Sequence, residues 1–113
     1  MSDDPQVRRY KRRTKMVLPV RVKLPGAAAR DLKVAYTLDA TDRGVRLAGL
    51  EAEVKVDDVI EIHNRTKRAL FRIVWIKQSD KASERQIGAV CVEEKNIWSV
   101  DFPADAQDSD QKK

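Results

Sequence analysis

Two short stretches of the sequence carry residue types that bind anions and purine bases, and the first is rich in arginine. Six of the eight residues from 8 to 15 are basic, and an Arg-x-x-x-Arg spacing occurs twice, as Arg9 with Arg13 and as Arg8 with Arg12. The guanidinium group presents a planar fork of donors that matches a phosphate and also the O6/N7 edge of guanine. This stretch predicts an arm that folds over a phosphate-bearing ligand.

The second stretch, residues 39–44, is a polar turn between two apolar runs. The carboxylate of Asp39 can accept from the N1–H and N2–H₂ groups of a guanine, which adenine does not present. The Thr41 hydroxyl can donate to a phosphate or accept from the local backbone. Gly44 permits a positive φ or a close backbone approach that a Cβ would obstruct. The turn therefore supplies chemistry that complements the arginine arm.

Each stretch also has a simpler interpretation. A basic run is commonly a solvated arm or a nonspecific tether, and a polar turn between strands commonly contains only local Asx-type hydrogen bonds. The joint occurrence favours a shared site, because the two stretches lie on either side of the first two predicted strands. An up-and-back pair of strands would return the chain near its start and place Asp39 close to Arg13.

Alternating apolar residues predict the elements that position these stretches. No window sustains a helical period for ten residues, whereas period-two alternation is frequent between turn signals. The predicted strands cover residues 17–24, 31–38, 45–50, 60–63, 69–76 and 87–92. Six short antiparallel strands indicate an all-β barrel or sandwich, and the barrel is the first choice.

The same patterns predict which side chains enter the core. In the second strand the inward residues are expected to be Leu32, Val34, Tyr36 and Leu38. Apart from Arg72, the strand over residues 69–76 is apolar at both parities, which is typical of a strand buried on both faces or of a barrel strand partly covered by a terminal segment.

Single residues complete the expected core. Trp75 is expected there, although an indole on the motif side would stack on a guanine. Cys91 is expected in the core or at an interface, and Gly88 suits a bulge or a corner in a curved sheet. Residues 96–103, which include Ile97 and Trp98, are expected to seal one end of the core.

Composition limits the classes of function. A chain of 113 residues with a net charge of +5 fits one domain with anionic partners. Cys91 and His63 are the only residues of their kinds, so we expect no intrachain disulfide, structural zinc site or cofactor. No catalytic constellation is found, which argues against an enzyme. The sequence has no apolar run long enough for a secretory signal or a membrane span, and we expect a cytoplasmic protein.

With these residues, the sequence resembles the PilZ domain, a family of cyclic di-GMP receptors. The family motif Arg-x-x-x-Arg, which precedes the first strand, corresponds to Arg9 and Arg13, with Arg8 and Arg12 as an alternative frame. The motif Asp/Asn-x-Ser-x-x-Gly, which follows the second strand, corresponds to Asp39, Thr41 and Gly44. The resemblance covers residues 8–103, after a disordered lead over residues 1–7 and before an acidic tail over residues 104–113.

The resemblance implies a bacterial signalling protein that binds cyclic di-GMP and passes the signal to a protein partner when its arginine arm becomes ordered over the barrel. The sequence departs from the family at Thr41, where serine is usual, and at the C-terminus, where the usual helix is short or absent. Arg8, directly before the first motif, allows a stacked pair of dinucleotides, and Trp75 is a further candidate for stacking on a base.

Two other functions remain open at this point. A small-barrel nucleic-acid binder would use the basic arm together with Arg65, Lys67 and Arg68, but aromatic residues make up only 5% of the chain. A PilZ-like barrel that has lost its ligand would serve as a protein-interaction module. Selective, stoichiometric binding of cyclic di-GMP separates the receptor hypothesis from the nucleic-acid binder and from the protein-interaction module.

Overall fold

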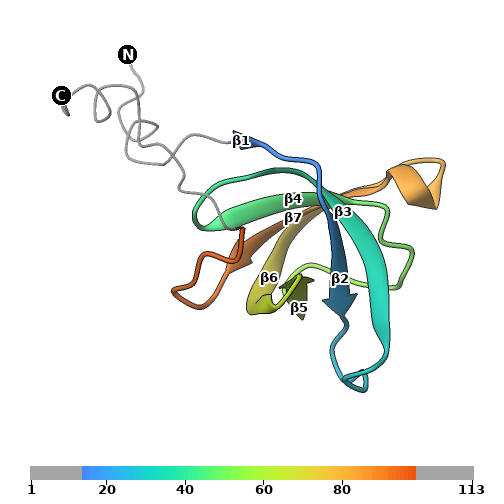
Figure 1. The fold of residues 1–113 in the computed structure, drawn as a ribbon. Helices are drawn as coiled ribbons and strands as arrows, with labels where there is room; N and C mark the ends of the chain where they lie inside the picture. Colours follow the sequence, from blue (N-terminus) through green and yellow to red (C-terminus); the bar gives the residue numbers. More distant parts are fainter. Residues whose placement is uncertain (1–13, 99–113) are drawn as a thin grey trace, which may run out of the picture.

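The computed structural model describes residues 14–98, except the side chain of Ala82, and in this range it is all-β with no α-helix (Figure 1). One turn of 3₁₀-helix, η2, spans Ala82–Glu84. The strands are β1 Thr14–Lys15, β2 Pro19–Lys23, β3 Leu32–Ala40, β4 Gly44–Ala48, β5 Val59–Asn64, β6 Lys67–Lys77 and β7 Gln86–Cys91.

Six of the strands close a ring. The order runs β3, β2, β5, β6, β7 and β4, and a further pairing of β4 with β3 completes the circle. Every pairing is antiparallel, and β1 lies outside the ring against the end of β3. The predicted fold class, a six-stranded antiparallel barrel, is confirmed. The ring has no free sheet edge along most of its length, which removes sites for edge-to-edge pairing.

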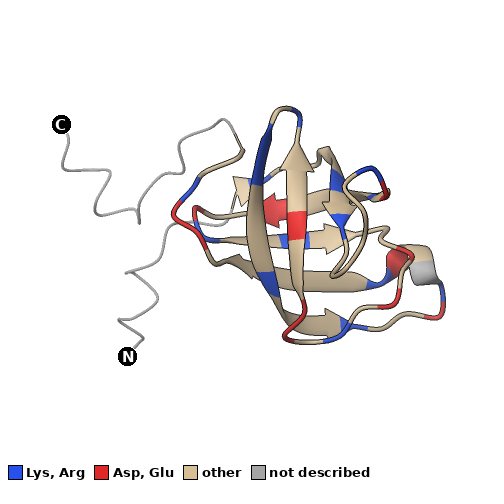
Figure 2. Ribbon diagram, turned by 90° about the horizontal axis from the view of Figure 1, so that it is seen from below, with Lys and Arg blue, Asp and Glu red and all other residues tan. Residues whose placement is uncertain are grey.

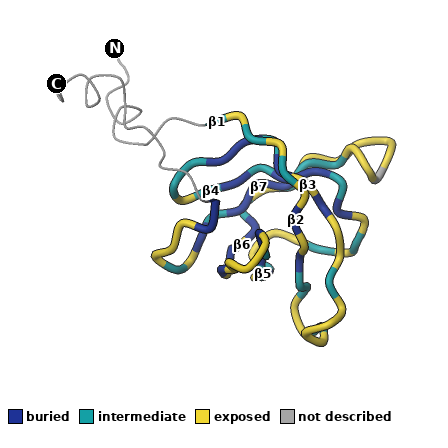
Figure 3. Tube along the Cα trace, viewed as in Figure 1, coloured by how far each residue is buried: buried dark blue, intermediate teal, exposed yellow. Residues whose placement is uncertain are grey.

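The barrel interior is filled by one face of each strand, as Figure 3 shows by the alternation of buried and more exposed residues. Val20 and Val22 of β2, and Ile60 and Ile62 of β5, are at most 3% exposed. Their neighbours in sequence point outward because successive side chains of a strand alternate between its faces. The predicted alternation of these two strands is confirmed.

One end of the core is sealed by the chain after β7, as predicted for Ile97 and Trp98. Both side chains are buried, and the Trp98 ring lies 6.2 Å from that of Phe71. The Asn64 amide donates to the carbonyl of Ile97 at 2.7 Å. Residues 99–103, which the same prediction included, lie outside the described residues.

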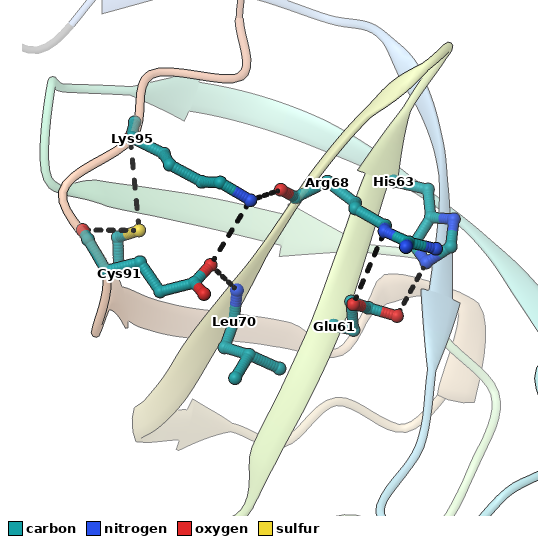
Figure 4. Close-up of polar contacts among 7 residues, drawn as sticks. Glu61, His63, Arg68, Leu70, Cys91 and Lys95 are labelled. Carbon is teal, nitrogen blue, oxygen red and sulfur yellow. Dashed lines mark hydrogen bonds and ion pairs between the residues drawn. The ribbon is translucent and has the colours of Figure 1, made fainter.

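The turn that leads to this seal is held by polar contacts (Figure 4). The Leu70 amide donates to the Glu93 carboxylate at 3.0 Å, and the Lys95 ammonium donates to the carbonyl of Arg68 at 2.7 Å. The thiol of Cys91 is buried, as predicted, and donates to the carbonyl of Glu93 at 3.1 Å. These bonds fasten the segment after β7 to β6.

The inward residues predicted for β3 were wrong. Val34 is 66% exposed and Tyr36 is 40% exposed, whereas Ala35 and Thr37 are buried. Ala35 pairs directly with Val20, and residues opposite each other in neighbouring strands share a face. The buried face of β2 therefore decides which face of β3 is inside, although the larger apolar residues of β3 then point outward.

Of the two explanations for the apolar residues 69–76, burial on both faces is wrong. Ala69, Phe71 and Ile73 are buried, but the alternate residues are not, and Leu70 is 37% exposed. Strand β6 thus has one face in the core and one mixed face on the outside, where Leu70 lies between Arg68 and Arg72. No helix among the described residues is long and apolar enough to cross a membrane.

Candidate ligand-binding site

Two β-bulges turn site residues from the core face to the outer face of the barrel. In β3 the register against β4 shifts between Thr37 and Asp39, and in β6 the register against β7 shifts between Ile73 and Trp75. Thr37 and Ile73 point into the core, so regular strands would place the residues two positions later in the core as well. The extra residue in each bulge reverses that orientation.

The bulges align four residues in one row across four adjacent strands. Asp39 of β3 pairs with Arg46 of β4, Arg46 pairs with Gly88 of β7, and Gly88 pairs with Trp75 of β6. This row forms the floor of a pocket with a volume of about 120 Å³. Thr41 and Gly44 contribute to the wall of the same pocket. The structure therefore brings together every predicted site residue that lies within the described range.

An ion pair occupies one end of this row. The Arg46 guanidinium donates to the Asp39 carboxylate at 2.5 Å and to the Gln86 side chain at 3.3 Å. The Asp39 side chain is 9% exposed, and that of Arg46 is 35% exposed. A charged hydrogen bond of this kind orients the carboxylate. Asp39 is therefore held as an acceptor in the pocket.

The turn after β3 is organised by the Thr41 hydroxyl. Its oxygen accepts from the amides of Arg43 at 3.1 Å and Gly44 at 2.9 Å, and the Thr41 amide donates to the carbonyl of Gly44 at 2.8 Å. A Cβ at Gly44 would lie 3.3 Å from the carbonyl oxygen of Ala89, so the close approach of two backbones explains the glycine. Of the alternatives that the sequence left open, the structure shows Thr41 as an acceptor for the local backbone and Gly44 at a close backbone approach.

Replacing Thr41 with alanine is expected to destabilise the protein by about 1 kcal/mol, because two amide donors in the turn lose their acceptor. Thr41→Ser keeps the hydroxyl and is expected to stay close to wild type. Urea unfolding of both variants measures the difference. Equal stability of the alanine and serine variants would contradict this role of the hydroxyl.

The other end of the row is a half-exposed indole. Trp75 is 39% exposed, so its expected place in the core was wrong. A Cβ built on Gly88 would lie 2.2 Å from the indole ring, which shows that the ring rests directly on the β7 backbone. The bulge expected near Gly88 lies in the neighbouring strand β6, opposite Gly88. The glycine has no side chain, and this leaves room for the indole. The ring forms a flat apolar wall of the pocket.

The chain enters the described region next to the pocket. Thr14 pairs with Ala40 and Lys15 pairs with Asp39, so β1 runs along the strand end that precedes the Thr41 turn. Thr37 fixes this entry: its hydroxyl donates to the carbonyl of Met16 and accepts from the Leu18 amide at 2.9 Å. The predicted arm residues Arg8, Arg9, Arg12 and Arg13 lie outside the described residues.

Three residues of this site were missed in the sequence. Arg46 follows Gly44 by two positions, and that spacing on a strand was a usable signal that both lie on one face. Gln86 and Gly88 had no such signal, because only the pairing of β7 with β4 and β6 brings them to the row. No cluster of three or more His, Cys, Asp or Glu residues that could hold a metal ion occurs within residues 14–98.

A second polar cluster lies on the outer face of β5 and β6 (Figure 4). The Glu61 carboxylate is 2.9 Å from His63 Nε2 and 3.9 Å from Arg68 Nε. The hydrogen bond with His63, followed by the charges of His63, Arg68 and Lys23, lowers the pKa of Glu61 even though partial burial opposes this shift. Since the pKa is lowered on folding, ionised Glu61 stabilises the folded state above its unfolded pKa. This contribution is lost as the pH falls through the folded pKa.

Glu61→Gln is therefore expected to cost about 0.5 kcal/mol of stability near neutral pH, within the range of exposed ion pairs, and nothing once the carboxyl is protonated. Urea unfolding well above and well below the usual carboxyl pKa measures both values. Glu94→Gln is the matched control, because Glu94 is exposed and contacts no charged group among the described residues. An equal loss at both pH values would contradict an ionic role for Glu61.

A scan against protein-family models gives no match to this chain, and a search of curated proteins gives none.

Proposed function

We propose that this protein is a non-enzymatic receptor for cyclic di-GMP. The observation that carries the proposal is that Asp39, Thr41, Gly44 and Trp75 line one pocket, although Trp75 is more than 30 residues away from the others in the sequence. The first three were selected for a guanine- and phosphate-bearing ligand by their chemistry and by their resemblance to a PilZ motif. Their convergence with an aromatic wall supports such a ligand.

Each pocket residue has a role in this proposal. Asp39 accepts from the N1–H and N2–H₂ edge of one guanine while it keeps its bond with Arg46, because a carboxylate has about four acceptor sites. Trp75 stacks on the base, whose flat face matches the indole. The pocket is apolar at Trp75 and charged at Asp39, so a base can lie with one edge on the carboxylate and its face on the ring.

The arm supplies the phosphate contacts in this proposal. The arm comes directly before β1 in the sequence, and β1 pairs with β3 at Asp39. Its arginines are Arg9 and Arg13, or Arg8 and Arg12 in the alternative frame. Guanidinium groups bind phosphates and guanine edges in the same bidentate way. We propose that ligand binding fixes this arm over the barrel and that a protein partner recognises the ordered arm.

Calorimetric titration with cyclic di-GMP tests the proposal, with GTP and cyclic di-AMP as competing ligands. Saturable binding that is selective for the guanine dinucleotide and lost in Arg13→Ala supports it, and Lys11→Ala is the matched control. The stoichiometry reports whether Arg8 allows two dinucleotides per chain. A nucleic-acid binder would instead show affinity that grows with oligonucleotide length and falls steeply with salt. Absence of binding at high ligand concentration would overturn the proposal.

Trp75→Ala is expected to weaken this binding about tenfold, because base stacking on an aromatic ring contributes about 1–3 kcal/mol. Intrinsic fluorescence provides the matched control within the chain. Trp98 is 4% exposed at the barrel end, so ligand should change the emission of Trp75 and leave that of Trp98 unaltered. A ligand-dependent signal that persists in Trp75→Phe and disappears in Trp98→Phe would contradict the assignment.

A further inference from the structure

A groove separate from the pocket lies on the outer face of β2, β3 and β5. It has a volume of about 450 Å³, an apolar wall that includes Leu32 and Val34, and a polar side that includes Arg21, His63 and Arg65. Arg21 pairs with Val34 on one side and with His63 on the other, so one apolar and two basic residues lie in a row across three neighbouring strands. The Val34 side chain is 66% exposed and available for contact in the groove.

Two arginines of the groove have no acidic partner among the described residues. Arg21 and Arg65 are exposed and make no ion pair with another described residue. The nearby acid, Glu61, is already paired with His63 and Arg68 (Figure 4). On the strands of the whole barrel, Lys and Arg are more frequent than Asp and Glu, as the colours of Figure 2 show. A groove of this kind suits an acidic segment with one apolar side chain.

The chain itself contains such a segment. Residues 101–110 carry four aspartates and no Lys or Arg, and Phe102 stands between Asp101 and Asp105. The described chain ends close to the groove, because Asn64, which lies between His63 and Arg65 in sequence, donates to the carbonyl of Ile97 at 2.7 Å. The four steps along the chain from residue 97 to residue 101 can span roughly 13 Å.

We propose that residues 101–105, which lie outside the described residues, bind this groove within the same chain. Phe102 packs against Val34, and Asp101 and Asp105 pair with Arg21 and Arg65. Tethering raises the effective concentration of the segment to the millimolar range, so weak contacts are sufficient. The bound segment would serve as an internal counterion for these two arginines. This inference does not depend on the binding of cyclic di-GMP.

Disulfide trapping in the full chain tests this. Val34→Cys with Phe102→Cys is compared with Val92→Cys and Phe102→Cys, both in a Cys91→Ala background whose folding is checked first by thermal melting. Val92 is 49% exposed and is only ten residues from position 102, so an unbound segment should reach it at least as readily. We expect the Val34 pair to form an intramolecular disulfide faster by about fivefold or more.

Charge reversal provides the second arm of the test. Arg21→Glu with Arg65→Glu is expected to slow trapping of the Val34 pair to the rate of the Val92 pair, and high salt should act in the same direction. Adding Asp101→Arg and Asp105→Arg to the reversed groove should restore the rate. Equal trapping of the two pairs, or no response to charge reversal, would overturn the proposal. Disulfides formed mainly between chains would assign the groove to a second copy and would also overturn it.

Discussion

Asp39→Ala is expected to weaken binding of cyclic di-GMP by about 100-fold while the barrel stays folded. The carboxylate accepts two hydrogen bonds from the guanine edge in the proposed complex, and losing charged bonds in a half-enclosed site costs about 3 kcal/mol. The Arg46 guanidinium also loses its partner at 2.5 Å, but its side chain is 35% exposed and can be solvated. Calorimetric titration measures the affinity, and thermal melting checks the fold.

Asp42→Ala is the matched control for this variant. Asp42 belongs to the same turn, carries the same charge and does not line the pocket. A general effect of negative charge near the site would appear in both variants, whereas recognition of a guanine edge would be lost only without Asp39. Undiminished affinity in folded Asp39→Ala would remove this residue from the proposed site.

Gly88→Ala is expected to have the largest effect of any single methyl group added at the site. The new Cβ would lie 2.2 Å from the Trp75 ring, so the indole must leave its place on β7. Overpacking of this kind typically costs about 1–3 kcal/mol, and the pocket loses the wall proposed to stack on a base. We therefore expect lower stability in urea together with loss of ligand binding.

The double variant Gly88→Ala with Trp75→Ala separates this cause from others. If the clash with the indole is the source of the instability, removing the indole makes room for the methyl group, and the double variant should be no less stable than Trp75→Ala. Additive losses would show that Gly88 is needed for another reason. Gly26→Ala is a second comparison, because nothing lies within 4 Å of its Cβ and only its φ of 77° opposes alanine.

The sequence predicted the turn of the site better than its wall. Asp39, Thr41 and Gly44 lie within six residues, so local chemistry and turn signals were sufficient to select them. Arg46 could also have been selected from the sequence, since it lies two residues after Gly44 and residues two apart on a strand share a face. Trp75 was considered for stacking but expected in the core, because it lies in the most apolar run of the sequence, residues 69–76.

A bulge explains why Trp75 lies outside the core although Ile73, two residues earlier on the same strand, lies inside it. A regular strand would place Trp75 opposite Ile87, which is buried, but the register shift after Ile73 places it opposite Gly88 instead. The same device acts at Asp39, which pairs with Arg46 rather than Val45. A bulge depends on the pairing of two strands and has no reliable signature in either strand alone, so no reading of one strand could predict these orientations.

By itself, the sequence determined the all-β class, the six strands of the ring, the polar turn over residues 39–44 and the apolar seal by Ile97 and Trp98. These follow from local patterns: period two, turn residues and short apolar runs. Only the tertiary structure decided that Ala35 rather than Val34 faces the core, and that Asp39 and Trp75 share an outer row. The physical reason is that strand pairing between distant segments fixes each register, and one residue of shift moves a side chain to the opposite face.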